Sequence, residues 1–552
     1  MKAEAFFIDD SVGNFTPGFA GLETALADLL AGFAPAEIRK DIHQLVTRVT
    51  LALADGHSCL PVTAREEKIA LASGCADESG LLPLSIFAGR IYLSRYFHYE
   101  KRLASNCRRL ATAQTAWRAM ALFGQLFPED AGQRQAAEIA LRRKLCLISG
   151  GPGTGKTATV VRIIAMLLEA HGPTLKIALA APTGKAAMRL KESLTSSLVH
   201  PPLPPEIVAA MPRESFTLHR LLGARVHSPH FRHNAENPLP YDVVIVDEAS
   251  MADLALMAKL TDALPEQARL ILLGDQNQLT SVESGAVFAE MLTGLPDCRV
   301  VLSTAYRFNP GIGAFAQAIR EGNTETAWTI AASSAYPEIH LEQRTEAEAL
   351  WEKRLPAYMD AVGDFPEKAS IGEIFAAFRR LQTLCATRGE SWGVAGVNQR
   401  VERLLRRKGY ASGPNLWYAG RPVLLRRNDF SLGLYNGDLG ICLPDDNPGD
   451  GAGFRVWFDG GGDFRPFPPW RLPEHDTAWA ITIHQSQGSE CAEVLLILPE
   501  KDHPVLSREL LYTGVTRARD QVHLVASRDT LRLALERPVA RHSGLAAFFS
   551  SI

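Results

Sequence analysis

The chain has 552 residues, of which 46% are hydrophobic, 22% charged and 8% aromatic. This composition is that of an ordinary globular protein, and it excludes collagen-like, disordered and disulfide-scaffold proteins. With 58 Lys and Arg against 61 Asp and Glu, the net charge is -3, so any contact with nucleic acid must be local. At roughly 100–200 residues per domain, the length predicts about three or four domains.

The cysteines and the N-terminus indicate a reducing compartment. Eight cysteines are scattered without a Cys-x-x-Cys pair, so neither a zinc site nor a disulfide framework is expected. We interpret them as small core residues. Met1–Asp10 lacks the features of a signal peptide, and no uninterrupted apolar run of about 18 residues occurs. The sequence therefore predicts a cytoplasmic protein with no membrane partner.

The first predicted domain, residues 1–123, is mostly helical, because its apolar residues recur at helical spacing. Within it, a helix over Ile91–Glu100 would carry three tyrosines on one face, at Tyr92, Tyr96 and Tyr99. This aromatic face either packs in the core or docks on another protein. The sequence leaves both interpretations open.

After this domain, short β-rich runs alternate with helical segments, which is typical of parallel sheets covered by helices. The first set of predicted strands is Leu145–Ser149, Ile177–Ala181, Val243–Asp247, Leu270–Gly274 and Val300–Ser303. The second set is Leu381–Thr387, Ala478–His484, Glu493–Leu498 and Gln521–Ala526. We therefore expect an α/β protein with two sheets, and we assign its two α/β domains to residues 124–298 and to residues 299–408 with 474–552.

The second α/β domain is interrupted between residues 409 and 473. This segment is rich in Gly, Pro and Asp and holds short strand-like pieces at Pro422–Arg426, Gly440–Leu443 and Phe454–Phe458. An inserted small β-barrel is the simplest explanation.

A phosphate-binding loop, Gly150-Gly-Pro-Gly-Thr-Gly-Lys-Thr157, follows the first predicted strand and precedes a helical run. Its backbone N–H groups would surround the phosphates of ATP at a helix N-terminus. Lys156 would reach the β- and γ-phosphates, and the Thr157 hydroxyl would bind Mg²⁺. The predicted nucleotide-binding residues of the loop are Gly150, Gly151, Pro152, Gly153, Thr154, Gly155, Lys156 and Thr157.

Two further motifs follow apolar strands. Asp247 would complete the Mg²⁺ site and Glu248 would polarise the attacking water. Taken alone, this pair could equally be a helix cap, but its position downstream of the phosphate loop indicates NTP hydrolysis. In Gly274–Gln278, the side chain of Gln278 could sense the γ-phosphate.

The order of these motifs resembles that of superfamily-one helicases, specifically the RecD family, the alpha subunits of bacterial exodeoxyribonuclease V (RecBCD). The resemblance spans nearly the whole chain, and its motifs are Gln133, Ala181–Ala187, Thr217–Gly223, Asp247–Met251, Gly274–Leu279 with Ser281–Ala286, Tyr306-Arg307, Trp392–Val394, Tyr435–Asp438, Thr482–Gly488 and Tyr512–Ala518. It implies two RecA-like motor domains, a β-hairpin insertion at about 223–240, and a Src-homology-3-like barrel as the second insertion.

The resemblance also implies roles in the ATP site. Gln133 would read the adenine and Glu490 the ribose, while Gly488 would approach the γ-phosphate. The implied catalytic residues are Lys156, Asp247, Glu248, Gln278, Arg307 and Arg517, with Thr157 and Asp247 binding the metal. A guanidinium from the second domain stabilises the charge of phosphoryl transfer only in a closed cleft, so hydrolysis would be coupled to domain motion.

Single-stranded DNA would cross both motor domains. Its implied contacts are Pro182, Thr183, Lys185, Thr217, His219, Asn398, Thr482 and His484. These side chains suit phosphate and sugar contacts, which position a strand without reading its sequence. In the basic stretch Ala224–Asn234, Phe231 either splits the duplex or packs a small hairpin.

The leading hypothesis is an ATP-dependent 5'-3' DNA helicase in a heterotrimer with RecB and RecC, acting on duplex ends in double-strand-break repair and recombination. The N-terminal domain would dock on RecC. Two alternatives stay open: a structural subunit that binds nucleotide without work, and a stand-alone RecD-like helicase. Beyond the ATP site we find no acidic cluster, so the sequence predicts no nuclease centre in this chain.

Overall fold

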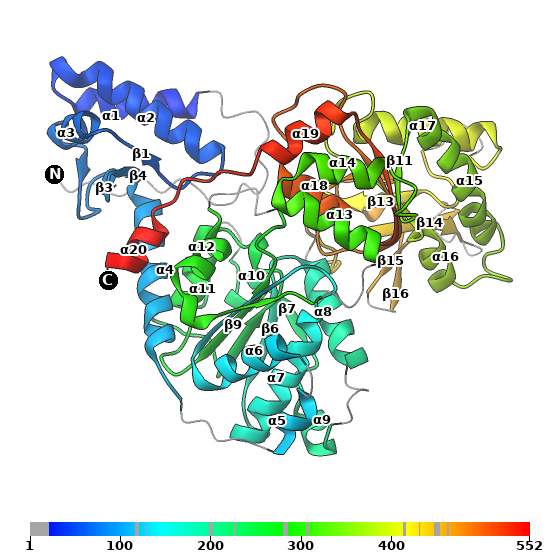
Figure 1. The fold of residues 1–552 in the computed structure, drawn as a ribbon, viewed down its shortest axis with the longest axis horizontal. Helices are drawn as coiled ribbons and strands as arrows, with labels where there is room; N and C mark the ends of the chain where they lie inside the picture. The colour runs from blue at the N-terminus through cyan, green and yellow to red at the C-terminus, as the bar shows by residue number, and fades with distance from the viewer. Residues whose placement is uncertain are drawn as a thin grey trace.

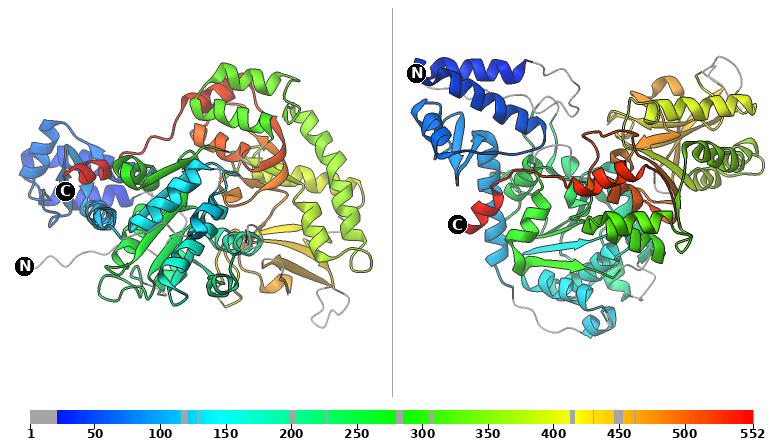
Figure 2. Two further views of the ribbon diagram at one scale, coloured as in Figure 1. Left: turned by 60° about the horizontal axis from the view of Figure 1, so that its bottom comes forward. Right: turned by 45° about the horizontal axis from the view of Figure 1, so that its top comes forward.

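The computed structural model describes residues 21–115, 121–127, 130–197, 203–225, 228–279, 285–304, 309–411, 416–429, 431–445, 453–460 and 463–551. Figure 1 shows an N-terminal part in blue, a first α/β unit in cyan and green, and a second α/β unit in green to red. Figure 2 shows the same arrangement from two other directions. The described residues form a sheet in each of these three parts and a further sheet inserted in the second α/β unit.

The sheet of the first α/β unit is wholly parallel, as predicted, with strand order β10-β5-β9-β8-β6-β7. Its strands are β5 (Leu145–Gly150), β6 (Ile177–Ala181), β7 (Ser215–Thr217), β8 (Val243–Val246), β9 (Arg269–Gly274) and β10 (Arg299–Leu302). Because side chains alternate along a strand, Leu145 and Leu147 face one layer of helices and Cys146 and Ile148 the other. Both faces are therefore buried, which explains the continuous apolar runs.

Helices cover both faces of this sheet. One layer contains α5 (Ala121–Leu126), α6 (Ala131–Arg142), α7 (Lys156–His171), α8 (Gly184–Ser197) and α9 (Pro205–Ala210). The other layer contains α4 (Ser94–Thr112), α10 (Leu218–Leu222), α11 (Leu254–Asp262), α12 (Val287–Gly294) and α20 (Leu545–Ser551). Thus α4, which the sequence assigned to the N-terminal domain, packs on the first large sheet.

The second α/β unit also has a parallel sheet, with order β11-β20-β19-β12-β18. Its strands are β11 (Ile339–Leu341), β12 (Leu381–Cys385), β18 (Ala480–Thr482), β19 (Cys491–Ile497) and β20 (Ala518–Val525). One face packs against α13 (Pro310–Glu321), α14 (Thr324–Ala332), α18 (Arg508–Val515) and α19 (Arg528–Glu536). The other face packs against α15 (Arg344–Gly363), α16 (Ile371–Phe378) and α17 (Val394–Arg407).

A small antiparallel sheet is inserted between α17 and β18. Its strands are β13 (Pro422–Leu425), β14 (Leu439–Pro444), β15 (Phe454–Asp459), β16 (Phe464–Phe467) and β17 (His475–Thr477), in the order β16-β15-β14-β13-β17. It has an apolar core of its own, which includes Val423, Cys442 and Val456. The insertion also reaches the first unit, because a Cβ on Gly184 would lie 3.1 Å from the Cγ of Tyr435.

The N-terminal part is less helical than predicted. Beside α1 (Leu22–Phe33), α2 (Arg39–Ala54) and α3 (Ala64–Ala72), it contains the four-stranded sheet β1-β4-β3-β2. The strands are β1 (Leu60–Pro61), β2 (Ala76–Asp77), β3 (Leu84–Phe87) and β4 (Arg90–Leu93). Such short strands leave too few residues for a clear alternating pattern, which explains why the sequence did not reveal them.

The predicted tyrosine face on a helix over Ile91–Glu100 is wrong. Tyr92 lies on β4 and is buried, because α4 begins only at Ser94. Its hydroxyl donates to Oε2 of Glu100 at 3.2 Å. Tyr99 is also buried, so these aromatic side chains pack in the core.

The C-terminal strap, residues 537–551, leaves the second α/β unit after α19 and ends beside α4 and α12 (Figure 1). The ring of Phe548 on α20 stacks on Phe87 with centroids 4.0 Å apart. The backbone N–H of Ser58 donates to the carbonyl of His542 at 2.9 Å. The strap therefore connects the second unit to both the first unit and the N-terminal part.

Two carboxyl groups meet the strap at Ser543, whose Oγ lies 2.7 Å from Oε1 of Glu100 and 2.7 Å from Oε2 of Glu290. A hydroxyl carries one proton, so both contacts are hydrogen bonds only when one carboxyl group is protonated. Burial and the charge of Glu100 raise the pKa of Glu290 to about 7, although Ser543 and Arg90 oppose the shift. Docking of the strap is therefore linked to protonation.

We expect Glu290→Gln to hold the strap more tightly at pH 8. Because the pKa of Glu290 lies above its usual value of 4.5, the wild type loses stability as the pH rises from 4.5 to about 7 and regains none above it. A glutamine is uncharged and still accepts from Ser543. Proteolysis of the strap at pH 8 should slow at least about tenfold, because the pKa of Glu290 is raised by more than one unit and each unit corresponds to a factor of ten.

At pH 5.5 the rates of wild type and variant should converge, since Glu290 is then protonated. Glu206→Gln on the exposed surface of α9 is the matched control and should change neither rate. Equal cleavage of wild type and Glu290→Gln at pH 8 would show that the carboxyl charge does not weaken the strap.

All eight cysteines are buried and unpaired with one another, as predicted for core residues. None of the helices within the described ranges is both long and apolar enough to cross a membrane.

Candidate ATP and DNA sites

The phosphate loop lies between β5, which ends at Gly150, and α7, which begins at Lys156. Gly153 and Gly155 have φ angles of 76° and 80°, a left-handed conformation that glycine adopts without steric strain. The hydroxyl of Thr154 donates to the carbonyl of Gly151 at 2.8 Å. A Cβ on Gly150 would lie 2.5 Å from that hydroxyl oxygen, so the turn requires glycine. The result is a tight backbone loop at a helix N-terminus, which suits an anion.

Lys156 lies over this loop. Its Nζ donates to the carbonyls of Gly150 at 2.6 Å and Gly151 at 3.1 Å. An ammonium group has three donors, so a third remains for a phosphate oxygen. Thr157 follows in the first turn of α7 and is half-buried.

Asp247 and Glu248 follow β8. The backbone N–H of Asp247 donates to Ala180 at 2.9 Å, and its Oδ1 accepts from the N–H of Glu248 at 2.8 Å. Burial and the adjacent Glu248 raise the pKa of Asp247 to about 6, while Lys156 opposes the shift. Asp247 and Thr157 supply the hard oxygen ligands that Mg²⁺ prefers, so this donor set fits the ion.

Glu248 has a φ of 52°, which is uncommon for a residue with a side chain. Such strain is maintained only where the surrounding structure enforces it, and it concentrates at functional sites. The conformation marks Glu248 as a candidate functional residue, and its role beside the attacking water stays a prediction.

Gln278 is buried in the turn after β9. Its Nε2 donates to Oδ2 of Asp275 at 3.1 Å, and the N–H of Asn277 donates to Oδ1 of the same carboxylate at 3.0 Å. Asp275 therefore orients the side chain that the sequence assigned to the γ-phosphate.

Gln133 lies in the first turn of α6, where its N–H donates to Oδ1 of the capping residue Asp130 at 2.9 Å. Its own Oε1 accepts from Nη1 of Arg162 at 2.7 Å, which leaves the amide NH₂ group for an adenine. The neighbouring Gly132 packs near Leu302, which also lies next to Gly150. Gln133 is therefore held near the phosphate loop.

The second α/β unit contributes Arg517, Gly488 and Glu490. The guanidinium of Arg517 is buried and donates through Nε to Thr513 and through Nη1 to Ser489, both at 3.2 Å. A Cβ on Gly488 would lie 3.7 Å from that of Ala186 in the first unit.

Glu490 and Arg517 also act electrostatically on a first-unit arginine. Burial lowers the pKa of Arg189 on α8; Glu490 opposes this shift and Arg517 adds to it. Arg307 lies outside the described residues.

The predicted DNA contacts of the first unit cluster at two helix N-termini. Thr183 accepts from the N–H of Ala186 at 3.2 Å at the start of α8, next to Pro182. Thr217 accepts from the N–H of Arg220 at 3.2 Å and caps α10. Lys185, on α8, is close enough to Arg379 of the second unit and Asp438 of the inserted sheet to feel their charges. Burial, Arg189 and Arg379 lower its pKa to about 8, and Asp438 opposes them.

Phe231 packs against the first unit. Its ring makes an edge contact with His219, with centroids 5.6 Å apart, and Nζ of Lys259 lies 5.4 Å from its centre. Phe231 also forms one antiparallel bridge with Ala224. These contacts favour the packing role. Burial lowers the pKa of His219, which keeps the ring neutral at physiological pH.

A groove of about 480 Å³ in the second unit contains the other predicted DNA contacts, Thr482 and His484. Thr482 exchanges hydrogen bonds with Gln485 at 3.0 and 3.2 Å. The groove also contains Thr387 and Arg388, which sequence reasoning missed. Their position just after β12 was a usable signal, because ligands bind at the carboxyl ends of parallel strands.

Asn398 does not fit its predicted contact with DNA. Its Nδ2 donates to the carbonyls of Thr477 at 3.0 Å and Ala480 at 3.2 Å, and its Oδ1 accepts from the N–H of Ala480 at 2.9 Å. Both amide donors are therefore used, and none remains for a phosphate. Asn398 instead fixes the start of β18.

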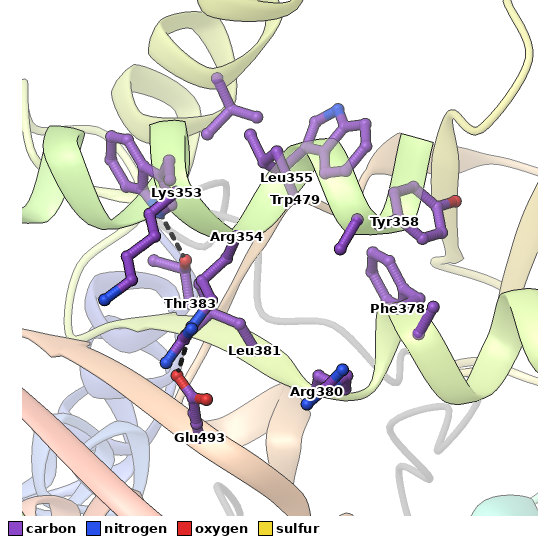
Figure 3. A pocket seen from close by; sticks show the side chains of 14 residues that line it. Lys353, Arg354, Leu355, Tyr358, Phe378, Arg380, Leu381, Thr383, Trp479 and Glu493 are labelled. Carbon is purple, nitrogen blue, oxygen red and sulfur yellow. Dashed lines mark hydrogen bonds and ion pairs between the residues drawn. The ribbon is translucent and has the colours of Figure 1, made fainter. Parts of the chain in front are cut away.

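Another cavity, of about 160 Å³, lies between α15, α16 and β12 (Figure 3). Trp351 donates through Nε1 to the Thr383 hydroxyl at 3.0 Å, and Arg354 pairs with Glu493 at 2.9 Å. None of the predicted site residues lines it. Groups of three or more His, Cys, Asp or Glu able to hold a metal are absent from the described ranges.

Comparisons with known proteins agree with this geometry. A family model described as an AAA domain matches residues 133–284, and a UvrD-like helicase C-terminal domain matches residues 477–525. The RecBCD enzyme subunit RecD of Mycolicibacterium smegmatis is 40% identical over 84% of this chain and 82% of its own length. The chain belongs to the RecD family.

Other members and relatives extend the comparison. The RecD subunit of Mycobacterium tuberculosis strain H37Rv is 36% identical to this RecD-family chain, over 91% of the chain and 87% of the relative. The ATP-dependent RecD2 DNA helicase of Deinococcus radiodurans is 31% identical over 86% of this chain and 61% of the relative. Among solved structures, the Pif1 helicase from Candida albicans is 18% identical in sequence. The match covers 76% of this chain and 98% of the Pif1 chain, with a TM-score of 0.42.

Proposed function

We propose that this RecD-family chain is an ATP-dependent DNA helicase whose two α/β units act as RecA-like motor domains. The observation that carries the proposal is that groups from both units converge on one phosphate loop. Around Gly151 lie Lys156 and Asp275 from the first unit and the Tyr512 hydroxyl from the second. A site built from two units is complete only when they are together, so hydrolysis is coupled to their motion.

Each catalytic group has a defined task. Lys156 neutralises charge on the β- and γ-phosphates, and Glu248 orients and deprotonates the attacking water. Thr157 and Asp247 would hold Mg²⁺, which would supply further neutralisation of phosphate charge. Arg517, together with Arg307, stabilises the charge that develops as the γ-phosphoryl group is transferred.

Single-stranded DNA lies across both units in this proposal. The first unit contacts it through Pro182, Thr183, Lys185, Thr217 and His219, and the second through the groove with Thr387, Arg388, Thr482 and His484. Contacts of these types hold phosphates and sugars, so movement is independent of sequence. Burial lowers the pKa of His484, and the charge of the exposed Arg388 lowers it further, which supports a cationic groove.

We further propose that the motor runs 5' to 3', assembles with RecB and RecC, and has no nuclease centre of its own. The assembly is supported by the names of the relatives, which are RecBCD enzyme subunits. The N-terminal part is the proposed docking region for RecC.

The test is strand displacement on duplexes with either a 5' or a 3' single-stranded overhang, by the chain alone and with its partner subunits. We expect ATP-dependent unwinding from the 5' overhang, and none in a complex carrying Lys156→Gln. Preference for the 3' overhang would contradict the proposed 5'-3' polarity. Release of nucleotides by the chain alone would contradict the lack of a nuclease centre.

A stand-alone helicase is the second candidate, favoured by the 31% identity to the RecD2 helicase over 86% of this chain. The two candidates differ in their partners. Co-purification of RecB and RecC with the chain at native expression supports the subunit, and a monomer in the same extract supports the stand-alone enzyme.

A further inference from the structure

Asp275 is a buried carboxylate at the centre of the ATP site. It is 1% exposed, and its two oxygens accept from the side chain of Gln278 and the backbone N–H of Asn277. The charge of Lys156 lowers its pKa against the larger, opposite effect of burial. Asp275 therefore lies close to the phosphate-binding lysine while it orients Gln278.

A third partner of Asp275 comes from the other α/β unit. The hydroxyl of Tyr512, on α18, hydrogen-bonds to this carboxylate. A Cβ on Gly151 would lie 2.9 Å from the Tyr512 hydroxyl oxygen and 3.9 Å from Oδ2 of Asp275. Tyr512 thus reaches across the cleft to the phosphate loop, where burial raises the pKa of its hydroxyl and keeps it protonated as a donor.

The turn that carries Gln278 makes two more hydrogen bonds to the second unit. The N–H of Leu279 donates to Oγ1 of Thr513 at 2.9 Å, and Nε2 of Gln487 donates to the carbonyl of Leu279 at 2.8 Å. These two hydrogen bonds hold the backbone of the turn at Leu279. The Tyr512 hydroxyl is different, because it acts on the carboxylate that binds the Gln278 side chain.

We propose that Tyr512 is a positioning residue for ATP hydrolysis: by donating to Asp275 only when the two units are together, it sets the orientation of Gln278 towards the γ-phosphate. Separation of the units removes this donor, and Asp275 is left with partners from its own turn. Gln278 is thereby correctly aligned only in the closed cleft. The inference rests on the proposed ATP hydrolysis.

The ring and the hydroxyl of Tyr512 have separable roles. The ring packs in the core of the second unit with Leu511 and Val515, whereas the hydroxyl faces the first unit. Tyr512→Phe therefore keeps the packing and removes only the hydrogen bond to Asp275. Tyr358→Phe is the matched control, since it removes one buried hydrogen bond, to the carbonyl of Gly420 at 2.8 Å, in the same unit.

The experiment measures DNA-stimulated ATP turnover of the full chain, with its partner subunits where turnover needs them. Tyr512→Phe should lower kcat roughly 10-fold or more, the usual effect of losing a hydrogen bond to a charged group, and leave the Kd for ATP within about twofold. Tyr358→Phe should leave both unchanged. In a Gln278→Ala background, Tyr512→Phe should have no further effect, because the hydroxyl acts through Gln278.

A kcat within about twofold of wild type for Tyr512→Phe, or an undiminished loss in the Gln278→Ala background, would overturn the inference. If Tyr512→Phe lowers the melting temperature more than Tyr358→Phe does, Asp275→Asn replaces it as the test. That variant must then lose turnover with unchanged ATP affinity. Absence of ATP hydrolysis by the wild type would instead contradict the proposed function itself.

Discussion

Lys156→Gln should lower ATP turnover at least about 100-fold, the effect of removing one preorganised donor from a transition state. The fold should survive, because Lys156 is half-buried and donates only to the loop carbonyls of Gly150 and Gly151. A shorter, uncharged glutamine cannot neutralise the γ-phosphate. Steady-state hydrolysis with saturating single-stranded DNA measures the loss.

Lys144→Gln is the matched control. Lys144 precedes β5 at the end opposite the phosphate loop, and its Nζ donates to the carbonyl of Glu266 and the side chain of Gln267. The substitution removes the same charge close to the opposite end of β5, away from the phosphate loop, so turnover should not change. Turnover of Lys156→Gln within about threefold of wild type would refute the assignment of the phosphate loop.

Arg517→Ala should bind ATP with little change in affinity and lose turnover roughly 1,000-fold, the lower end of the usual contribution of an arginine finger. Its guanidinium has five N–H donors, of which Nε and one Nη1 donor bind Thr513 and Ser489, so donors remain for a phosphate. The measurement pairs equilibrium binding of ATP with single-turnover hydrolysis.

Two further variants test whether the loss of turnover comes from the guanidinium of Arg517. Arg517→Lys keeps the charge without the planar fork, so it should retain more turnover than alanine and less than wild type. Arg519→Ala, two residues away and exposed, should behave as wild type. Loss of ATP binding in a folded Arg517→Ala variant would mean that this arginine holds the nucleotide in the ground state.

The parts of the site that sequence predicts best are those set by local order along a parallel sheet. Lys156, Asp247 and Gln278 each follow an apolar strand, and β5, β8 and β9 are neighbours whose carboxyl ends share one edge. The two parallel sheets and the relative positions of these motifs can therefore be predicted from one sequence, since each motif comes shortly after a predicted strand.

The features that the sequence did not predict depend on contacts between residues far apart in the chain, which leave no local pattern. Glu100 and Ser543 are 443 residues apart, and nothing near either residue predicts that they meet. The resemblance implies a DNA contact for Asn398, yet its amide group bonds to the backbone of Ala480, 82 residues later in the chain. Tyr512 belongs to a recognised motif, but its partner Asp275 lies in the other α/β unit. β11 has only three residues, too few for periodicity.

The C-terminal strap changes how the motor can move. Most pairs of domains are joined by one linker, about which they can swivel in any direction. Here the chain passes between the units twice, once after β10 and once along the strap after α19, and α20 is anchored in the core beside α4. Because the strap is a second connection between the units, anchored at α20, it restricts the directions in which they can separate. The stroke of the second unit should therefore be mainly a rotation about the line that joins the two connections.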